Sequence, residues 1–183
     1  MTTKKKLLLA ACCGPCATHA IEELSRQYSV TVHFWGSNIH PRDEYEKRLE
    51  ALGQVCAAYD CPLVAHPYND TEFIDNVKGL ENEREGGARC TRCFELRLRT
   101  GIEYAIINDI PYVATSLTVS PHKNAEQINQ LGSHLTKELS NPGRFIKYLA
   151  TDFKANGGFG KSVELSKKIR IYRQNYCGCK FSK

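Results

Sequence analysis

A chain of 183 residues with 42% hydrophobic and 25% charged residues has the length and composition of one well-buried globular domain. Its apolar run from Leu7 to Ala11 is too short to span a membrane, and the Cys-Cys-Gly-Pro-Cys segment that follows is not a signal-peptide cleavage site. We therefore expect a cytoplasmic protein with no membrane partner. Despite its nine cysteines, this composition excludes a secreted disulfide scaffold.

Strands and amphipathic helices alternate along the chain. The predicted strands, rich in β-branched and aromatic residues, are Leu7 to Ala11, Val30 to Trp35, Pro62 to His66 and Tyr112 to Thr115. Helical patterns follow each of them, with Asp43 and Thr71 as expected N-caps and with Cys90 opening a helix that ends near Asn108. This alternation predicts an α/β fold, a parallel sheet covered by helices on both faces.

The segments between these elements are predicted as loops. Residues 81–89 are polar and contain two glycines, which favours a mobile loop, and residues 141–143 form a turn. Beyond the turn the pattern is short and basic, without a linker that would define a second domain. We expect a single domain over 1–183, with residues 144–183 packed on it.

The net charge of +5 is concentrated in that last segment. Residues 144–183 carry ten Lys or Arg against two acidic residues, whereas residues 1–143 carry fifteen basic and eighteen acidic ones. A lysine-rich helix face is commonly only solvated, but this asymmetry makes nucleic acid a serious candidate partner.

In a parallel sheet, ligands bind outside the carboxyl ends of the strands. Three segments are expected to meet there: the cysteines at 12–16, the loop at 37–41 and the loop at 120–124. The first of them ends a strand beside a helix N-terminus, where thiolates are electrostatically favoured. This edge of the sheet is therefore the predicted functional site.

Seven of the nine cysteines fall into three sets: Cys12/Cys13/Cys16, Cys90/Cys93 and Cys177/Cys179. One C-x-x-C pair is weak evidence, but three sets exceed the four ligands of a structural zinc site. Cys56 and Cys61 stand apart and are expected to be structural, because an unpaired cysteine behaves as a small hydrophobe.

Two thiol pairs from separate segments can hold an iron–sulfur cluster, which uses four thiolates. Cys90 and Cys93 are three residues apart and share a helical side. Adjacent residues of an extended strand point to opposite faces, so Cys12 and Cys13 can both ligate only if a turn at Gly14 rotates one of them.

The pair Cys177 and Cys179 suggests different chemistry. A disulfide across one intervening residue would be strained, and strained, exposed disulfides are redox-active. The alternative is a pair of additional metal ligands.

The three thiol sets, the Arg-Cys-x-x-Cys unit at 89–93 and the ending Ile-Tyr-Arg-Gln-Asn-Tyr-Cys-Gly-Cys at 171–179 together resemble the epoxyqueuosine reductases of the QueH family. Supporting stretches are Asn-Ile-His-Pro at 38–41, Glu-Tyr-Glu-Lys-Arg at 44–48, and Thr-Val-Ser-Pro-His-Lys-Asn at 118–124. The similarity runs from the first strand to the last residues, which is far more specific than any single C-x-x-C.

The resemblance implies a cobalamin-independent oxidoreductase with an adenine-nucleotide-hydrolase-like (HUP, Rossmann-like) fold, which reduces epoxyqueuosine to queuosine in tRNA with an external electron donor. It implies a redox-active pair at Cys177 and Cys179, and at Cys16 it suits a ligand of a second metal, a mononuclear iron ion. The implied [4Fe–4S] cluster has four thiolate ligands: Cys12, Cys13, Cys90 and Cys93.

Candidate residues for the rest of such a site follow from their chemistry. His40, Tyr172 and Tyr176 are candidate proton donors. Trp35 or Phe159 could stack on a splayed base. Candidate phosphate contacts are the basic side chains Arg144, Lys147, Lys154, Lys161, Lys167, Lys168, Arg170 and Arg173.

Two other functions fit part of the pattern. A tRNA sulfur-insertion enzyme of the ATP-pyrophosphatase type would need a Ser-Gly-Gly phosphate-binding turn after the first strand, where Cys12-Cys13-Gly14 stands instead. A zinc-stabilised tRNA-binding module would be colourless, whereas a protein with an iron–sulfur cluster is brown.

Overall fold

The computed structural model describes residues 4–140 and 143–182. Its sheet has five parallel strands in the order β3-β2-β1-β4-β5. The strands are β1 (Lys5–Ala11), β2 (Tyr28–Phe34), β3 (Leu63–Ala65), β4 (Tyr112–Thr115) and β5 (Lys147–Tyr148). The α-helices are α1 (Gly14–Leu24), α2 (Arg42–Ala58), α3 (Asp70–Asn76), α4 (Ala88–Ile107), α5 (Ala125–Leu139) and α6 (Gly158–Ile169). Short 3₁₀ turns are η1 (Ser116–Val119) and η2 (Ala155–Gly157).

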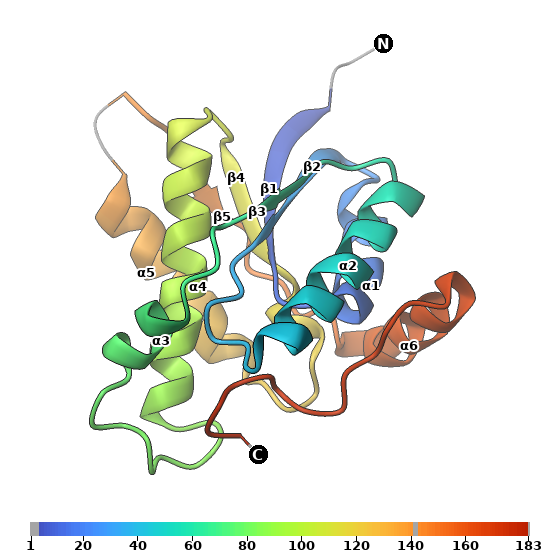
Figure 1. Ribbon diagram of the computed structural model, residues 1–183. Helices are drawn as coiled ribbons and strands as arrows, with labels where there is room; N and C mark the ends of the chain where they lie inside the picture. Colours follow the sequence, from blue (N-terminus) through green and yellow to red (C-terminus); the bar gives the residue numbers. More distant parts are fainter. Residues whose placement is uncertain (1–3, 141–142, 183) are drawn as a thin grey trace.

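Strand β1 lies at the centre of the sheet and is buried on both faces. Leu7 and Leu9 pack with side chains of α1 and α2, whereas Leu8 and Ala10 pack with those of α4 and α5. Helices α1, α2 and α6 lie on one side of the sheet, and α4 and α5 on the other (Figure 1). Double coverage explains why β1 is a continuous apolar run without alternation. The predicted α/β, Rossmann-like fold is confirmed.

The four predicted strands are present, but two predicted helix caps are wrong. Helix α2 has Pro41 at its N-cap, and Asp43 lies in the first turn. The N-cap of α3 is Asn69, whose side-chain Oδ1 accepts hydrogen bonds from the backbone N–H groups of Thr71 and Glu72. In both cases an acceptor or proline upstream begins the helix before the expected residue. The turn expected at 141–143 lies partly outside the described residues.

The sequence pattern did not predict β5 or α6. Strand β5 has only two residues, too few for a periodic signal. Helix α6 buries only Gly158, Ser162 and Ser166, small residues that let it approach α1 closely. Its large apolar side chains, Phe159, Val163, Leu165 and Ile169, are only partly buried, and its most buried positions hold small residues, so the buried face carries only a weak apolar signal in the sequence.

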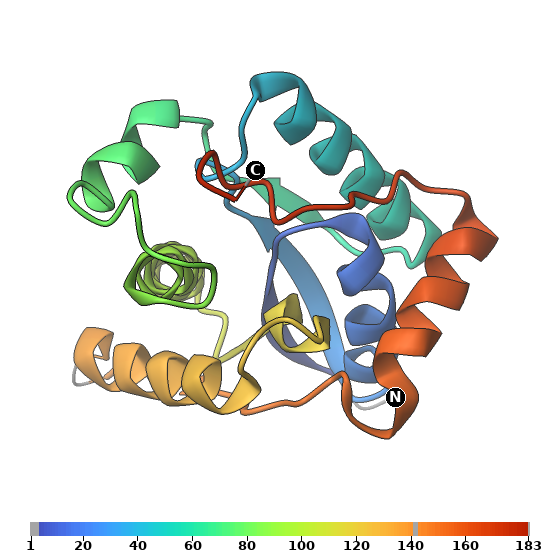
Figure 2. The same ribbon diagram turned by 90° about the horizontal axis from the view of Figure 1, so that it is seen from below.

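The segment 144–183 lies across the fold within its described part. Strand β5 pairs with β4, α6 packs on α1, and the chain after α6 crosses the carboxyl edge of the sheet (Figure 2). There Ile39 and Cys179 form an antiparallel bridge, and His40 N donates to Gly178 O at 2.8 Å. This crossing brings the last two cysteines of the chain to the predicted site.

Within the described part of the chain, no helix combines the length and the apolar character needed to cross a membrane.

One buried histidine predicts acid sensitivity of the fold. His33 of β2 is 2% exposed, and burial lowers its pKa from 6.5 to about 4. The unfolded chain therefore binds a proton below pH 6.5 that the folded chain accepts only near pH 4, so stability is lost as the pH falls through this window. At about 1.4 kcal/mol per pKa unit, we expect a loss of about 3 kcal/mol.

Urea unfolding between pH 7 and 4 measures this loss. His33→Gln should flatten the pH dependence of the free energy of unfolding. The control is His134→Gln, because that side chain is 73% exposed and should leave the slope unchanged. Equal slopes for wild type and His33→Gln would contradict the assignment.

Candidate functional site

Cys12 and Cys13 follow β1 and lead directly into α1. Cys13 is the N-cap of α1 in extended backbone, and its Sγ lies 3.8 Å from Cys12 Sγ. The two sulfurs therefore lie close together, but Gly14 does not act as the expected turn. It is the first residue of α1 without left-handed backbone, and a Cβ there would lie 3.0 Å from the backbone of Ala51 in α2. The glycine is needed for this close approach.

Cys90 lies in the first turn of α4 and Cys93 in the second, because the helix begins at Ala88 and not at Cys90 as expected. The N–H of Gly86 donates to Cys90 Sγ at 3.2 Å, as a loop backbone does at a sulfur ligand. Arg89, 2% exposed, donates to three carbonyls of the preceding loop, those of Leu80, Glu81 and Glu83. The loop predicted as mobile is thus tied to the helix that carries the two thiols.

A buried ion pair positions Cys177 and Cys179. Arg48 Nε lies 2.7 Å from Glu44 Oε1 on α2, with both side chains less than a tenth exposed. Arg48 also donates to the carbonyls of Tyr176 (3.0 Å) and Cys177 (2.8 Å). Gly178 between the cysteines has φ +96° and lies against the Arg48 guanidinium, with no room for a side chain.

The pKa values of four thiols of the site, those of Cys13, Cys90, Cys93 and Cys179, are raised, and burial contributes to each. That of Cys93 is raised to about 12 by burial and by the neighbouring charges of Cys177, Cys179 and Cys90, against the opposing effect of Arg97. For Cys13, the hydrogen bond with Cys12 lowers the pKa, but the hydrogen bond with Cys16 and burial outweigh it, so that the pKa is raised to about 11. Burial also raises the pKa values of Cys90 and Cys179. All nine cysteines are free thiols.

The thiols border a cavity of about 600 Å³. Cys12, Cys13, Cys16 and Cys177 line it, together with the 120–123 loop. Lys123 is half-buried there; burial lowers its pKa, but the charges of Cys12, Cys177, Cys16 and Cys13 outweigh burial and raise it. The ammonium is therefore a charge partner for thiolates. Two of the three expected segments, 12–16 and 120–124, are brought together around one hollow. No residue of the third, the loop at 37–41, lines the cavity; that loop pairs with the segment that carries Cys179.

The structure corrects the role expected for Trp35. Its side chain is 0% exposed, its Nε1 donates to Glu72 Oε2 at 3.1 Å, and its ring lies 5.3 Å from the Arg97 guanidinium. A fully buried indole cannot stack on a tRNA base. Phe159 does line the cavity, and its ring lies 5.6 Å from the guanidinium of Arg173, which also lines it.

Two of the three candidate proton donors donate hydrogen bonds to the scaffold, whereas the buried Nε2 of His40 has no hydrogen-bond partner among the described residues. The hydroxyl of Tyr172 donates to Glu44 Oε2 at 2.7 Å, and that of Tyr176 donates to His40 O at 2.9 Å. Burial lowers the pKa of His40. Of the three, only Tyr176 lines the cavity.

The basic side chains do not form one surface. Arg144 donates to the carbonyl of Ile106, and the sixteen residues from Cys90 to Ile106 span about 24 Å of helix α4. Lys147 lies in β5, where it pairs with Tyr112 at the amino end of β4. Arg173, by contrast, borders the cavity, and Lys167 and Lys168 end the helix that begins there.

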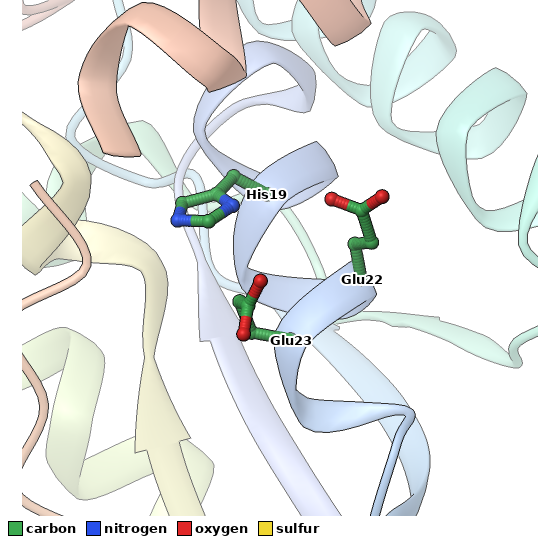
Figure 3. A group of neighbouring side chains, drawn as sticks. All are labelled: His19, Glu22 and Glu23. Atoms are coloured by element: carbon green, nitrogen blue, oxygen red, sulfur yellow. The ribbon is translucent and has the colours of Figure 1, made fainter. Parts of the chain in front are cut away.

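A second ligand-like group lies on α1. His19, Glu22 and Glu23 have ligand atoms within 4.8 Å of one another (Figure 3). Lys161 Nζ lies 2.7 Å from Glu22 Oε2 and 3.6 Å from Glu23 Oε1, and Arg26 lies 2.8 Å from Glu23 Oε2. Two cations already balance these carboxylates, so the group joins α6 to α1 and we assign no metal to it.

Sequence reasoning missed three charged residues of the site: Arg48, Arg97 and Lys123. Glu44 and Arg48 are spaced i,i+4, which indicates a helix pair but does not reveal whether the pair is buried. Arg97 follows Cys93 by four residues, so it lies on the same side of α4 as both thiols. Lys123 stands in a loop without any local signal.

A parallel α/β sheet with thiols of two segments lining a cavity at its carboxyl edge, and those of a third segment interacting with them, defines a Rossmann-like protein with a cysteine centre. The family model described as "Epoxyqueuosine reductase QueH" matches residues 7–183. The chain belongs to this family, whose members are oxidoreductases.

Individual relatives agree. A protein named epoxyqueuosine reductase QueH from Streptococcus pyogenes serotype M1 is 37% identical over 187 residues, covering 99% of this chain and 71% of its own. That of Acinetobacter baylyi is 35% identical over 178 residues, covering 97% and 80%. That of Thermotoga maritima is 31% identical over 179 residues, covering 96% and 89%.

Proposed function

We propose that this protein reduces epoxyqueuosine to queuosine in tRNA with an iron–sulfur cluster and a redox-active cysteine pair. The observation that carries the proposal is that thiols of two segments, Cys12, Cys13 and Cys16 of one and Cys177 of the other, line one cavity at the carboxyl edge of the sheet. The third segment lies close to them, because Cys90 and Cys93 both interact electrostatically with Cys177. The family of the chain supplies the reaction. In this scheme residues 1–183 act as one unit, and the segment 144–183 contributes the cysteine pair.

The donor set fits an iron–sulfur cluster. Cys12, Cys13, Cys90 and Cys93 offer four sulfurs, the number that a [4Fe–4S] cluster binds. Among the described residues lining the cavity, the only carboxylate is that of Glu85, which does not favour a hard cation such as magnesium. When bound, the cluster supplies one-electron transfer, and Cys16 at the cavity wall would hold the second, mononuclear iron.

The cysteine pair balances the reaction. Removal of the epoxide oxygen as water takes two electrons and two protons, and oxidation of the Cys177 and Cys179 thiols to a disulfide releases both. An external donor must then reduce the disulfide for the next turnover. Cys177 lines the cavity and Cys179 is buried beside it, so one thiol faces the substrate space and the other is shielded.

The basic residues near the cavity support a tRNA substrate. Arg173 and Phe159 lie at its wall, where a splayed base can stack on an aromatic ring or a guanidinium plane. Lys167, Lys168 and Arg170 are exposed on the adjoining helix and are proposed to meet phosphates. Lys154 and Lys161 have acidic partners within the chain and are expected to contribute less to phosphate binding.

Anaerobically purified protein tests the function. We expect brown protein with charge-transfer absorption, about five irons for every four acid-labile sulfides when the second iron is bound, and conversion of epoxyqueuosine in tRNA to queuosine under a low-potential electron donor. Colourless protein that binds zinc and tRNA without reduction would support the RNA-binding alternative and refute the proposal.

The dithiol has its own test. Cys179→Ser should end multiple turnover, because the disulfide can no longer form, while the cluster spectrum stays unchanged. Cys61→Ser is the control, since Cys61 lies beyond α2 and lines no part of the cavity. Product formed per enzyme over time is the measurement. Full multiple turnover by Cys179→Ser with an unrelated electron donor would remove the dithiol from the scheme.

A further inference from the structure

Helix α4 carries a buried positive charge beside the thiols. Arg97 is 2% exposed and follows Cys93 by one helical turn. Its Nη1 donates to the carbonyl of Ala11 at 3.1 Å and to that of Trp35, and its Nη2 donates to Asn38 Oδ1 at 2.6 Å. All three acceptors are neutral, so the guanidinium is hydrogen-bonded but its charge is not balanced.

A comparison with Arg48, a second buried arginine, shows that Arg97 lacks a carboxylate partner. Arg48 is equally buried and has the carboxylate of Glu44 at 2.7 Å. Across residues 4–140 and 143–182, no acidic side chain forms an ion pair with Arg97, and its buried Nε has no hydrogen-bond partner. An isolated buried charge is strongly disfavoured unless an opposite charge accompanies it.

Among the described residues, two thiols of the site are the groups that interact electrostatically with Arg97 and can become negatively charged. The guanidinium acts electrostatically on Cys12 from one pair and Cys93 from the other, favouring the thiolate of each. Ala11, whose carbonyl accepts a hydrogen bond from Arg97, directly precedes Cys12. Cys93 lies four residues before Arg97, on the same side of α4. Arg97 thus lies between the two thiol pairs.

Arg89, which directly precedes Cys90 on α4, has a similar arrangement. It is also 2% exposed, donates only to carbonyls, and acts on Cys90 and Cys179. Two buried guanidinium groups without carboxylate partners therefore flank the sulfurs. Such a site is built for an anion held by thiolates.

We infer that Arg97 is a positioning residue that provides the buried counter-charge of the thiolate-held cluster and sets its reduction potential. The inference rests on the proposed function, because it requires that cluster. When the cluster takes up one electron from a reductant such as dithionite, it gains one negative charge, and a fixed nearby cation stabilises the reduced form. Arg97 accordingly makes the cluster easier to reduce.

An EPR-monitored reductive titration of the anaerobic holoenzyme tests this inference. Arg97→Gln removes the charge while keeping an amide donor for the carbonyls. We expect the ratio of reduced to oxidised cluster at a fixed potential to fall about tenfold, which for a one-electron couple is a shift of 59 mV to more negative values. Arg97→Lys keeps a positive charge and should restore most of the wild-type potential.

A second variant leaves Arg97 in place. Asn38→Asp sets a carboxylate on the guanidinium, because Asn38 Oδ1 already accepts its hydrogen bond at 2.6 Å. It should shift the potential in the same negative direction, even if Arg97→Gln fails to fold. The control is Arg99→Gln on the same helix, whose guanidinium already pairs with Glu95 and Glu138 and should leave the potential unchanged.

Each outcome decides the question. A negative shift in Asn38→Asp with none in Arg99→Gln supports the inference. Wild-type potentials in cluster-loaded Asn38→Asp and Arg97→Gln would overturn it while the proposed function stands. A wild-type protein without any iron–sulfur signal would overturn both.

Discussion

Cys93→Ala is expected to remove the iron–sulfur cluster and the reduction of epoxyqueuosine together. Cys93 lies in the second turn of α4, is nearly buried, and shares electrostatic interactions with Cys90, Cys177 and Cys179. Losing one of four thiolates leaves an iron without its protein ligand. The loss of activity should exceed the roughly 10–100-fold fall typical of changes around a metal ligand. Visible absorption, iron content and product formation are the measurements.

Cys56→Ala is the matched control for this variant. Cys56 is also buried, at 3% exposure, but it lies in α2 among the apolar side chains that cover the other face of the sheet. Its removal should lower stability somewhat and leave iron content per folded protein unchanged. If Cys93→Ala kept the full complement of iron and sulfide, Cys93 would not be a ligand.

The sequence predicted the fold well because the relevant signals are local. An apolar run such as that of β1 and the helical spacing of Leu98 and Ile102 in α4 each reflect burial on known faces. Helix α6 was not predicted, because its buried positions are the small residues Gly158, Ser162 and Ser166. The apolar residues of α6 are only partly buried, so the pattern does not identify the face that packs on α1.

The thiols of the site were predictable, whereas the groups that hold them were not. Residue type and spacing identify the cysteine sets in the sequence. Because ligand sites of parallel sheets lie at the carboxyl ends of the strands, these sets are expected at one edge. Whether Arg97 has a carboxylate partner depends on contacts across three segments of the chain. The burial of Trp35 likewise follows from packing at the end of β2, which the strand pattern leaves open.

The Glu44–Arg48 pair is the clearest case of this limit, because an identical spacing on α2 gives a second pair with the opposite environment. Arg42 and Glu46 are also i,i+4, at 3.0 Å, but their side chains are 71% and 60% exposed. In sequence the two pairs look alike. In the structure only Glu44–Arg48 lies under the segment that carries Cys177 and Cys179.

Arg48→Met should therefore lower the free energy of unfolding far more than Arg42→Met does. The change leaves the Glu44 carboxylate buried without its cation and removes the donors to Tyr176 O and Cys177 O. Breaking a buried pair in this way costs about 3–5 kcal/mol. We expect that loss in the free energy of unfolding by urea. We also expect faster tryptic cleavage after Arg173 and reduced turnover with the cluster still bound, because the cysteine pair is no longer held over the cavity.

Two comparisons separate the buried charge from a general effect of substitution on α2. Arg42→Met removes an exposed pair and should cost no more than about 0.5 kcal/mol, with unchanged proteolysis. Adding Glu44→Gln to Arg48→Met should recover part of the stability, because the unpaired carboxylate is gone, but not the turnover, because the hydrogen bonds to Tyr176 and Cys177 remain lost. Equal, small losses in Arg48→Met and Arg42→Met would mean that the pair does not hold the C-terminal segment.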